Sequence, residues 1–358
     1  MTSANKAFDI QDAIRTVVDG RELDQEQAAA AMDAIMTGTV TGAQIGALVT
    51  GLRMKGETAA EIAGFARAMR DHALQVDIEH DAEPLLDTCG TGGDHSNTFN
   101  ISTTATFAIA AAGVRIAKHG NRAASSLCGS ADLLEGLGVS VELTPAQVEE
   151  CVRRVGVGFM YAPAFHPAMR FVGPARKEMG IRTVFNILGP LANPAGTRHQ
   201  LIGVGHPDIA AKMAEVLSLL GSSHAVLVHA EEGLDEVGIQ GFSQITEWDE
   251  RWGEIQTYRV QPEDFGLERG TKEDLLGGDA AANVAITRSI LAGEQGPRRS
   301  ITLMNAGAGI YAANAAESFA EGVAMAAEAI DSGRAAEKLE QLVSVTRELV
   351  AQPEEVRV

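Results

Sequence analysis

A glycine-rich segment and the polar residues after it have the composition of a phosphate-binding site. Residues 87–94 (DTCGTGGD) directly follow an apolar stretch, and their glycines permit a sharp turn that brings backbone N–H groups close to an anion. Residues 100–103 (NIST) then open an Ala-rich stretch typical of a helix, whose N-terminus attracts negative charge. A tight turn with an ordinary helix cap would explain some of these residues, but the density of hydroxyl and amide side chains favours anion binding.

A second polar segment supplies positive charge. Residues 118–122 (KHGNR) end another apolar stretch, and Ser125, Ser126 and the turn 129–132 (GSAD) follow. Cations and hydroxyl donors at this density suit phosphate oxygens, and an acidic chain needs them locally to hold an anion. His119 taken alone is typical of a structural histidine, because no second His or Cys lies at metal-ligand spacing.

Asp235 and Glu236 form an acidic pair shortly after the apolar stretch 224–230 (HAVLVHA). Magnesium prefers few carboxylates, completed by waters and substrate phosphates. An exposed acidic loop is the alternative for this pair, and only the two phosphate-binding segments favour a metal site over it.

Composition excludes several classes of protein. The 358 residues carry a formal net charge of −19, which opposes binding to a nucleic-acid backbone. No basic leader and no run of about 18 apolar residues occurs, so we expect neither secretion nor a membrane span. Cys89, Cys128 and Cys151 are too scattered for a disulfide framework or a zinc site, so we expect a cytoplasmic protein.

The elements that must position these residues fall into two groups. Residues 1–75 predict a small helical domain, because apolar residues recur at helical spacing and three N-capping pairs occur. The pairs are Asp24 with Gln27, Thr41 with Gln44, and Thr58 with Glu61.

From residue 84 onward, apolar stretches typical of strands alternate with helical stretches. We expect strands at 84–89, 114–120, 139–143, 158–162, 201–205 and 224–230, an antiparallel pair at 242–248 and 253–260, and a strand near 300–306. We expect helices at 103–112, after 130, after Thr144, at 167–179 and at 209–220. The fold class is α/β, a mostly parallel sheet wrapped by helices, and neighbouring strands would bring both polar segments to one edge.

In order and spacing these motifs resemble the anthranilate phosphoribosyltransferase family, which has a nucleoside phosphorylase-like fold. The resemblance covers nearly the whole chain and includes residues 165–180 and 185–194, which are similar to the family's region between two domains. It implies a helical domain of residues 1–75 to which about 167–195 return, and an α/β domain of 76–166 and 196–358.

The resemblance implies transfer of the 5-phosphoribosyl group from phosphoribosyl pyrophosphate (PRPP) to the amine of anthranilate, a step of tryptophan biosynthesis. It implies PRPP contacts from Gly90, Gly93, Asp94, Thr98, Asn100, Ile101, Ser102, Thr103, Lys118, His119, Gly120, Asn121, Arg122, Ala123, Ala124, Ser125, Ser126 and Ser130. It implies anthranilate contacts from Gly90, His119, Asn121 and Arg176. Ser102, Asp235 and Glu236 would hold two Mg²⁺ ions per subunit, and a homodimer is the implied assembly.

This set of residues contains no convincing acid/base pair, which fits the implied reaction. The aromatic amine of anthranilate is neutral at physiological pH, so the difficult event is the departure of pyrophosphate. We expect Mg²⁺ and Lys118 to stabilise that transition state, with inversion at the anomeric carbon.

Two departures from the family pattern are His95 after Asp94 and the segment 237–239 (VGI) after the acidic pair. A pyrimidine nucleoside phosphorylase and a non-catalytic nucleic-acid-binding relative are the alternatives. Asn121, Arg176 and the acidic pair favour the transferase over the first, and the net charge disfavours the second.

Overall fold

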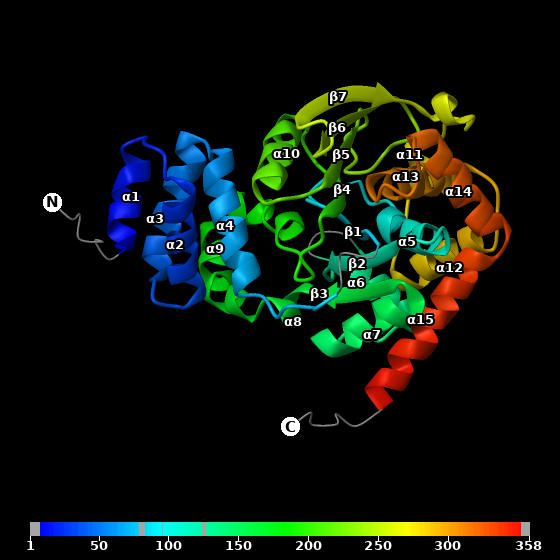
Figure 1. Cartoon of the computed structure of the whole chain (residues 1–358), viewed down its shortest axis with the longest axis horizontal. Helices are drawn as coiled ribbons and strands as arrows, with labels where there is room; N and C mark the ends of the chain where they lie inside the picture. The colour runs from blue at the N-terminus through cyan, green and yellow to red at the C-terminus, as the bar shows by residue number, and fades with distance from the viewer. Residues whose placement is uncertain (1–7, 79–82, 95, 124–126, 352–358) are drawn as a thin grey trace.

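A computed structural model describes residues 8–78, 83–94, 96–123 and 127–351. Its centre is a seven-stranded sheet in the order β3-β2-β1-β4-β5-β6-β7 (Figure 1). Strands β1 to β5 are parallel to one another, and β6 pairs antiparallel with both β5 and β7. The strands are β1 (Leu85–Gly90), β2 (Arg115–Gly120), β3 (Val157–Tyr161), β4 (His199–Gly203), β5 (His224–Ala230), β6 (Ser243–Asp249) and β7 (Glu254–Val260). The predicted fold class is therefore confirmed.

Helices cover both faces of this sheet. They are α5 (Ile101–Ala111), α6 (Ser130–Leu137), α7 (Pro145–Val155), α8 (Ala162–Phe165), α10 (Ala210–Leu219), α11 (Lys272–Leu275), α12 (Ala280–Leu291), α13 (Pro297–Ala312), α14 (Phe319–Asp331) and α15 (Arg334–Ala351). Along β5, Val226 and Val228 join the core beneath α5 and α13, whereas Ala225 and Leu227 join the core shared with α10 and the N-terminal helices. Burial on both faces explains why this strand is apolar without alternation.

Four N-terminal helices form a bundle at one end of the molecule (Figure 1). They are α1 (Ile10–Val18), α2 (Gln25–Met36), α3 (Gly42–Lys55) and α4 (Ala59–Asp71). All three predicted capping pairs are confirmed as reciprocal capping boxes. Glu61 of the third box is fully buried, and its carboxylate also accepts from Leu23 N at 2.9 Å and from Lys55 Nζ at 2.9 Å.

A segment from the middle of the chain returns to this bundle. It contains η1 (Pro167–Phe171), α9 (Gly173–Met179), η2 (Val184–Asn186) and η3 (Gly189–Leu191). The other 3-10 turns among the described residues are η4 (Pro207–Ile209) and η5 (Pro262–Phe265). Both α9 and η2 pack against α3, and η1 packs against α2. The predicted helix at 167–179 is thus a 3-10 turn followed by a short α-helix.

Two predicted strands are wrong. Residues 139–143 are not a strand: Val139, Val141 and Leu143 are buried, but Ser140 N donates to Thr346 Oγ1 of α15 at 3.1 Å, and β3 occupies the sheet edge. Residues 300–306 lie inside α13, which begins at Pro297. This helix is buried nearly all round, so its sequence lacks the amphipathic period that distinguishes a helix from a buried strand.

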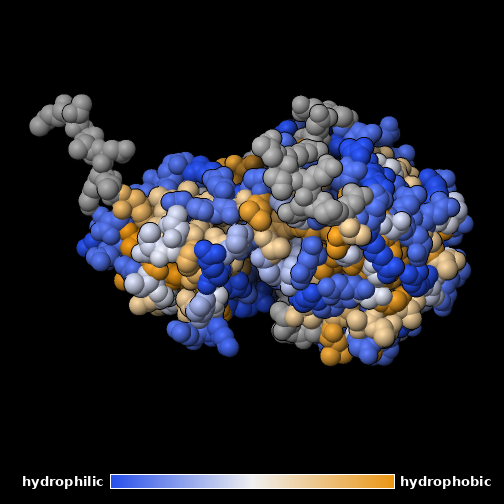
Figure 2. Space-filling view, turned by 90° about the horizontal axis from the view of Figure 1, so that it is seen from below, coloured by the Kyte–Doolittle hydropathy of each residue, from blue (hydrophilic) through white to orange (hydrophobic). Residues whose placement is uncertain are grey.

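One face of the molecule carries both hydrophilic and hydrophobic side chains (Figure 2). Hydrophilic residues cover much of the face in Figure 2, and the smaller helical end is joined to a larger α/β body. Within the described residues, no helix is both long and apolar enough to cross a membrane.

A buried polar cluster joins the antiparallel hairpin to α13. Glu247 of β6 accepts from Tyr311 and Tyr258 at 2.8 Å each and lies 2.8 Å from His224 Nε2, while His224 Nδ1 lies 2.8 Å from Asn314 Oδ1. Burial acts to raise the pKa of Glu247, but these hydrogen bonds outweigh it and lower the pKa. Although the ligand atoms of His224, Glu247 and Asp249 lie within 4.8 Å, protein partners occupy them, so the cluster is structural.

We expect Glu247→Leu to lower the free energy of unfolding by about 3–5 kcal/mol, because it leaves the buried partners of the carboxylate unsatisfied. Glu247 ionises more easily in the folded chain, so its stabilisation is present above the unfolded pKa and is lost as pH falls through the lowered folded pKa. Urea unfolding at pH 7 and below pH 4 checks both statements. Glu254→Leu on the exposed strand β7 is the control, and an equal loss in both variants would contradict the role of the cluster.

Candidate active site

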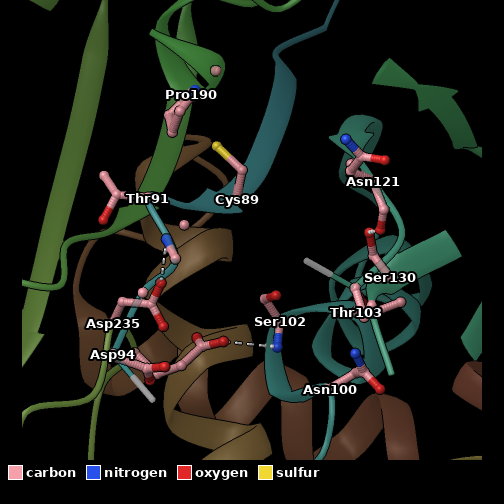
Figure 3. A pocket seen from close by; sticks show the side chains of 18 of the residues that line it. Cys89, Thr91, Asp94, Asn100, Ser102, Thr103, Asn121, Ser130, Pro190 and Asp235 are labelled. Atoms are coloured by element: carbon pink, nitrogen blue, oxygen red, sulfur yellow. Dashed lines mark hydrogen bonds between the residues drawn. The ribbon is translucent and has the colours of Figure 1, made fainter. Parts of the chain in front are cut away.

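A cavity of about 800 Å³ lies at the C-terminal ends of β1 and β2. Four parts of the chain line it: the segment from β1 into α5, the segment from β2 into α6, the loop after β5, and the stretch from α9 to η3. Parallel strands bring their carboxyl ends to one edge, so both predicted polar segments face this cavity. Figure 3 shows side chains from these segments around one opening.

Three carboxylates gather at one end of the cavity. Asp235 Oδ2 accepts from Gly92 N at 2.9 Å, and Glu236 Oε1 accepts from Ser102 N at 3.2 Å. Figure 3 shows Asp94 beside Asp235, with Ser102 facing them. Burial, reinforced by Asp94, raises the pKa of Asp235 to about 7, and burial with the charge of Asp235 raises the pKa of Glu236 to about 8.

These residues fit a divalent cation. Burial, and after it the neighbouring carboxylates, raise the pKa values of Asp235 and Glu236, and a bound Mg²⁺ would relieve both effects. Oxygen donors are the ligands that Mg²⁺ prefers, and the Ser102 hydroxyl at the N-terminus of α5 adds one more.

Missing Cβ atoms let the acidic loop approach the sheet. Gly90 of β1 pairs with Gly203 of β4 in parallel register. A Cβ on Gly203 would collide with the carbonyl oxygen of Asp235, and a Cβ on Gly90 would collide with its carboxylate. Both strand positions therefore require glycine for Asp235 to reach the glycine-rich loop.

Lys118 forms the floor of the cavity. Its side chain is 4% exposed, and Nζ donates to the backbone oxygen of Thr88 and, at 3.3 Å, to Thr88 Oγ1. Burial lowers the pKa of Lys118, while Asp87, Cys89 and Glu236 oppose that shift. The buried Asp87 accepts from His119 N at 3.1 Å, and burial raises the pKa of Asp87, while a hydrogen bond from Asn193 and the charge of Lys118 oppose that shift.

The second polar segment lines the cavity, and hydrogen bonds between its own residues hold its backbone in place. Asp132 Oδ2 accepts from Ala123 N at 2.9 Å and Gly129 N at 2.8 Å, and Ser130 Oγ donates to Asn121 O at 3.1 Å. These contacts fix a concave turn at the start of α6.

Arg122 lines the cavity, but its charge is balanced within the fold. It pairs with Glu135 through two hydrogen bonds, one of 2.8 Å, with Asp132 at 3.3 Å, and with the Tyr161 hydroxyl at 3.2 Å. It therefore supplies less free positive charge than the sequence indicated.

Aromatic side chains lie where His119 and the stretch from α9 to η3 line the cavity. The rings of His119 and His166 lie 4.9 Å apart, and the guanidinium of Arg176 lies 5.7 Å from the ring centre of Phe185. Burial, with a smaller effect of His166, lowers the pKa of His119 to about 3, and burial lowers that of His166 to about 4, so both imidazoles are neutral. His119 Nε2 is buried without a hydrogen-bond partner among the described residues.

Comparison with known proteins identifies the family. The glycosyl transferase family pattern matches residues 82–336 with its a/b domain and residues 11–73 with its helical bundle domain. Anthranilate phosphoribosyltransferase of Chloroflexus aurantiacus is 54% identical over 95% of this chain and 99% of its own. The chain belongs to the anthranilate phosphoribosyltransferase family. The enzyme of Symbiobacterium thermophilum is 50% identical over 95% of this chain and 98% of its own.

Solved structures of anthranilate phosphoribosyltransferases have the same fold. The structure from Thermus thermophilus has a TM-score of 0.88 and 44% identity, covering 94% of this chain and 99% of its own. The Saccharomyces cerevisiae structure in complex with PRPP and Mg has a TM-score of 0.85 and 28% identity, covering 95% of this chain and 98% of its own. The predicted family and enzyme class, a pentosyl-transferring glycosyltransferase, are confirmed, which disfavours both the nucleoside phosphorylase and the nucleic-acid-binding protein.

Every predicted site residue that the structure describes lines the cavity. Ala124, Ser125, Ser126 and the unusual His95 lie outside the described residues. Cys89, Thr91, Gly92 and Gly129 also line the cavity and belong to the segments predicted to bind phosphate, whereas the lining residues not predicted are Ser96, Asn97, Phe99, Cys128, Arg182, Phe185, Asn186, Gly189 and Pro190. Those from 182 to 190 belong to the stretch of about 167–195, which the resemblance assigned only to the return to the helical domain. Its polar and aromatic residues next to Gly and Pro are a signal that could have indicated a binding loop.

Proposed function

We propose that this chain transfers the 5-phosphoribosyl group from PRPP to the amine of anthranilate, giving N-(5-phosphoribosyl)anthranilate and pyrophosphate in tryptophan biosynthesis. One observation carries the proposal: a single cavity is lined both by a carboxylate cluster beside a glycine-rich loop and by His119, Arg176 and Phe185. Saccharomyces cerevisiae relatives are described in complex with PRPP and Mg and with 4-fluoroanthranilate, which supports both substrates.

On the donor side, we assign PRPP to the two polar segments predicted from the sequence. Backbone N–H groups and hydroxyls at the start of α5 would hold phosphate oxygens, and Lys118 would add a positive charge beneath them. We assign one Mg²⁺ to Ser102 and Glu236 and a second to Asp235 and Glu236. When bound, the metal spreads the charge that develops on the departing pyrophosphate.

On the acceptor side, the residues position the nucleophile. Neutral His119 and Asn121 would lie against the aromatic ring and its amine, and the planar Arg176 guanidinium suits the carboxylate. Because the amine is already neutral, holding it in line with the anomeric carbon is the main requirement, and inversion at that carbon follows.

We also propose the division of the chain and its assembly. The helical domain comprises residues 1–75 with about 167–195, and the α/β domain comprises 76–166 and 196–358. The free cysteines Cys89, Cys128 and Cys151 are compatible with a cytoplasmic location, and we propose a homodimer. Light scattering of the purified chain tests the dimer.

The test of the reaction is the loss of anthranilate fluorescence in a mixture of protein, anthranilate, PRPP and Mg²⁺. We expect loss only when both substrates and the metal are present, and EDTA stops it. No loss with folded protein would overturn the proposal and direct attention to phosphorolysis of uridine or thymidine.

We expect Arg176→Ala to raise the KM for anthranilate about 10- to 100-fold, because it removes the charge-assisted contact with the carboxylate. The KM for PRPP should change less than about twofold, since we assign the donor to other residues of the cavity. Lys177→Ala, on the exposed side of the same helix, is the control. If Arg176→Ala raises only the KM for PRPP, Arg176 binds the donor instead of anthranilate.

A further inference from the structure

Four cationic side chains line the described part of the cavity, and two of them have polar partners within the protein. Lys118 donates to Thr88 and Arg122 pairs with Glu135, whereas the guanidinium of Arg176 lies 5.7 Å from the ring centre of Phe185. The fourth is Arg182, which forms no hydrogen bond or ion pair with another described residue.

Arg182 approaches the glycine-rich loop from the other side of the cavity. It lies between α9 and η2, both of which pack on α3 of the helical bundle. A Cβ on Gly93 would collide with Arg182 Nη1, so the guanidinium lies against the backbone at this position. Gly93 has φ of 80° and follows Gly92, whose N–H donates to Asp235.

An unpaired cation at this place has an electrostatic role to fill. The glycine-rich loop is bordered by Asp94, Asp235 and Glu236, which repel a bare anion even though its backbone N–H groups suit one. A guanidinium offers a planar pair of donors that matches two phosphate oxygens at once. The segment that contains Arg182 packs on the helical bundle, whereas the glycine-rich loop follows β1 of the sheet. An anion bound by both Arg182 and this loop would therefore connect the two sides of the cavity.

We propose that Arg182 binds the diphosphate group of the donor from the helical side and so couples diphosphate binding to contact between the segment 180–183 and the glycine-rich loop. This inference rests on the proposed function, because it assigns a subsite of the same cavity. Gly93 is then the residue whose missing side chain lets the guanidinium reach its ligand.

The test measures binding of inorganic pyrophosphate with Mg²⁺ by calorimetry, together with KM values for both substrates. We expect Arg182→Gln to weaken pyrophosphate binding about 10- to 100-fold and to raise the KM for PRPP comparably, with the KM for anthranilate within about twofold. Arg182→Lys should restore part of the loss, since it keeps the charge but not the paired donors.

Arg170→Gln is the matched control. Arg170 is an exposed cation of the same returning segment, lies 4.7 Å from the Phe171 ring centre and does not line the cavity. The Arg170→Gln variant should bind pyrophosphate as the unsubstituted protein does. Equal melting temperatures of Arg170→Gln, Arg182→Gln and the unsubstituted protein would show that both variants fold.

Two results would overturn the inference: unchanged pyrophosphate binding by Arg182→Gln, or a rise confined to the KM for anthranilate. The proposed function can fail separately. If the unsubstituted protein binds Mg²⁺ with pyrophosphate through Arg182 but does not consume anthranilate, the diphosphate subsite stands and the acceptor is wrong.

Discussion

Glu236→Gln is expected to lower kcat/KM about 10²- to 10³-fold while it stabilises the metal-free protein at pH 8. Activity falls because Glu236 is the carboxylate that we assign to both Mg²⁺ ions, and electrostatic stabilisation of the leaving pyrophosphate depends on them. Stability rises because the amide keeps the shape of the side chain without a charge that the site disfavours.

The pH dependence follows from the raised pKa. Burial first, and Asp235 second, raise the pKa of Glu236 to about 8, so the folded metal-free protein holds a proton that the unfolded chain releases above pH 4.5. Stability therefore falls as pH rises from about 4.5 to about 8, and the advantage of Gln over Glu grows across that window. Because Mg²⁺ competes with the proton, its apparent affinity should fall as pH is lowered below 8.

Melting curves without metal at pH 5 and pH 8, together with initial rates, measure both effects. We expect the melting temperature of Glu236→Gln to exceed that of the unsubstituted protein by roughly 2 °C or more at pH 8 and to differ little from it at pH 5. Glu231→Gln, on the exposed start of the same loop, is the control for both measurements. A Glu236→Gln variant that is active or destabilised at pH 8 would contradict the carboxylate site.

Lys118→Met is expected to lower the free energy of unfolding by about 3–5 kcal/mol and kcat/KM by about 10²- to 10³-fold. Stability falls because the fully buried Asp87 loses the charge of Lys118, which favours its ionised form against burial. Activity falls because Lys118 is the positive charge that we place under the donor phosphates.

A second substitution separates these two roles. Asp87→Asn combined with Lys118→Met removes both buried charges, and Asn keeps an oxygen that can accept from His119 N. We expect urea unfolding to show most of the stability restored, while the activity stays low. If the double variant is as unstable as Lys118→Met alone, Asp87 is not the partner of this lysine.

Much of the fold could be predicted because its signals are local. Each capping box joins residues three positions apart, so Asp24, Thr41 and Thr58 mark helix starts that the structure confirms. Continuous apolar stretches likewise predicted β1 and β5. The prediction of a strand at 300–306 was wrong because a buried helix and a buried strand have the same apolar composition. Only the tertiary packing of α13, which begins at Pro297, determines that this segment is helical.

The sequence by itself determined the chemistry of the candidate site: which segments carry glycines, hydroxyls, cations and carboxylates, and in what order. The tertiary structure decided how these groups combine. Asp235 accepts a hydrogen bond from Gly92, which is 143 residues away in the sequence. Glu135 forms hydrogen bonds with Arg122, and Arg182 lies against Gly93 from a separate segment. Such pairings follow from how sheet and helices pack, because a contact between distant residues depends on the shape of everything between them and leaves no periodic trace in the chain.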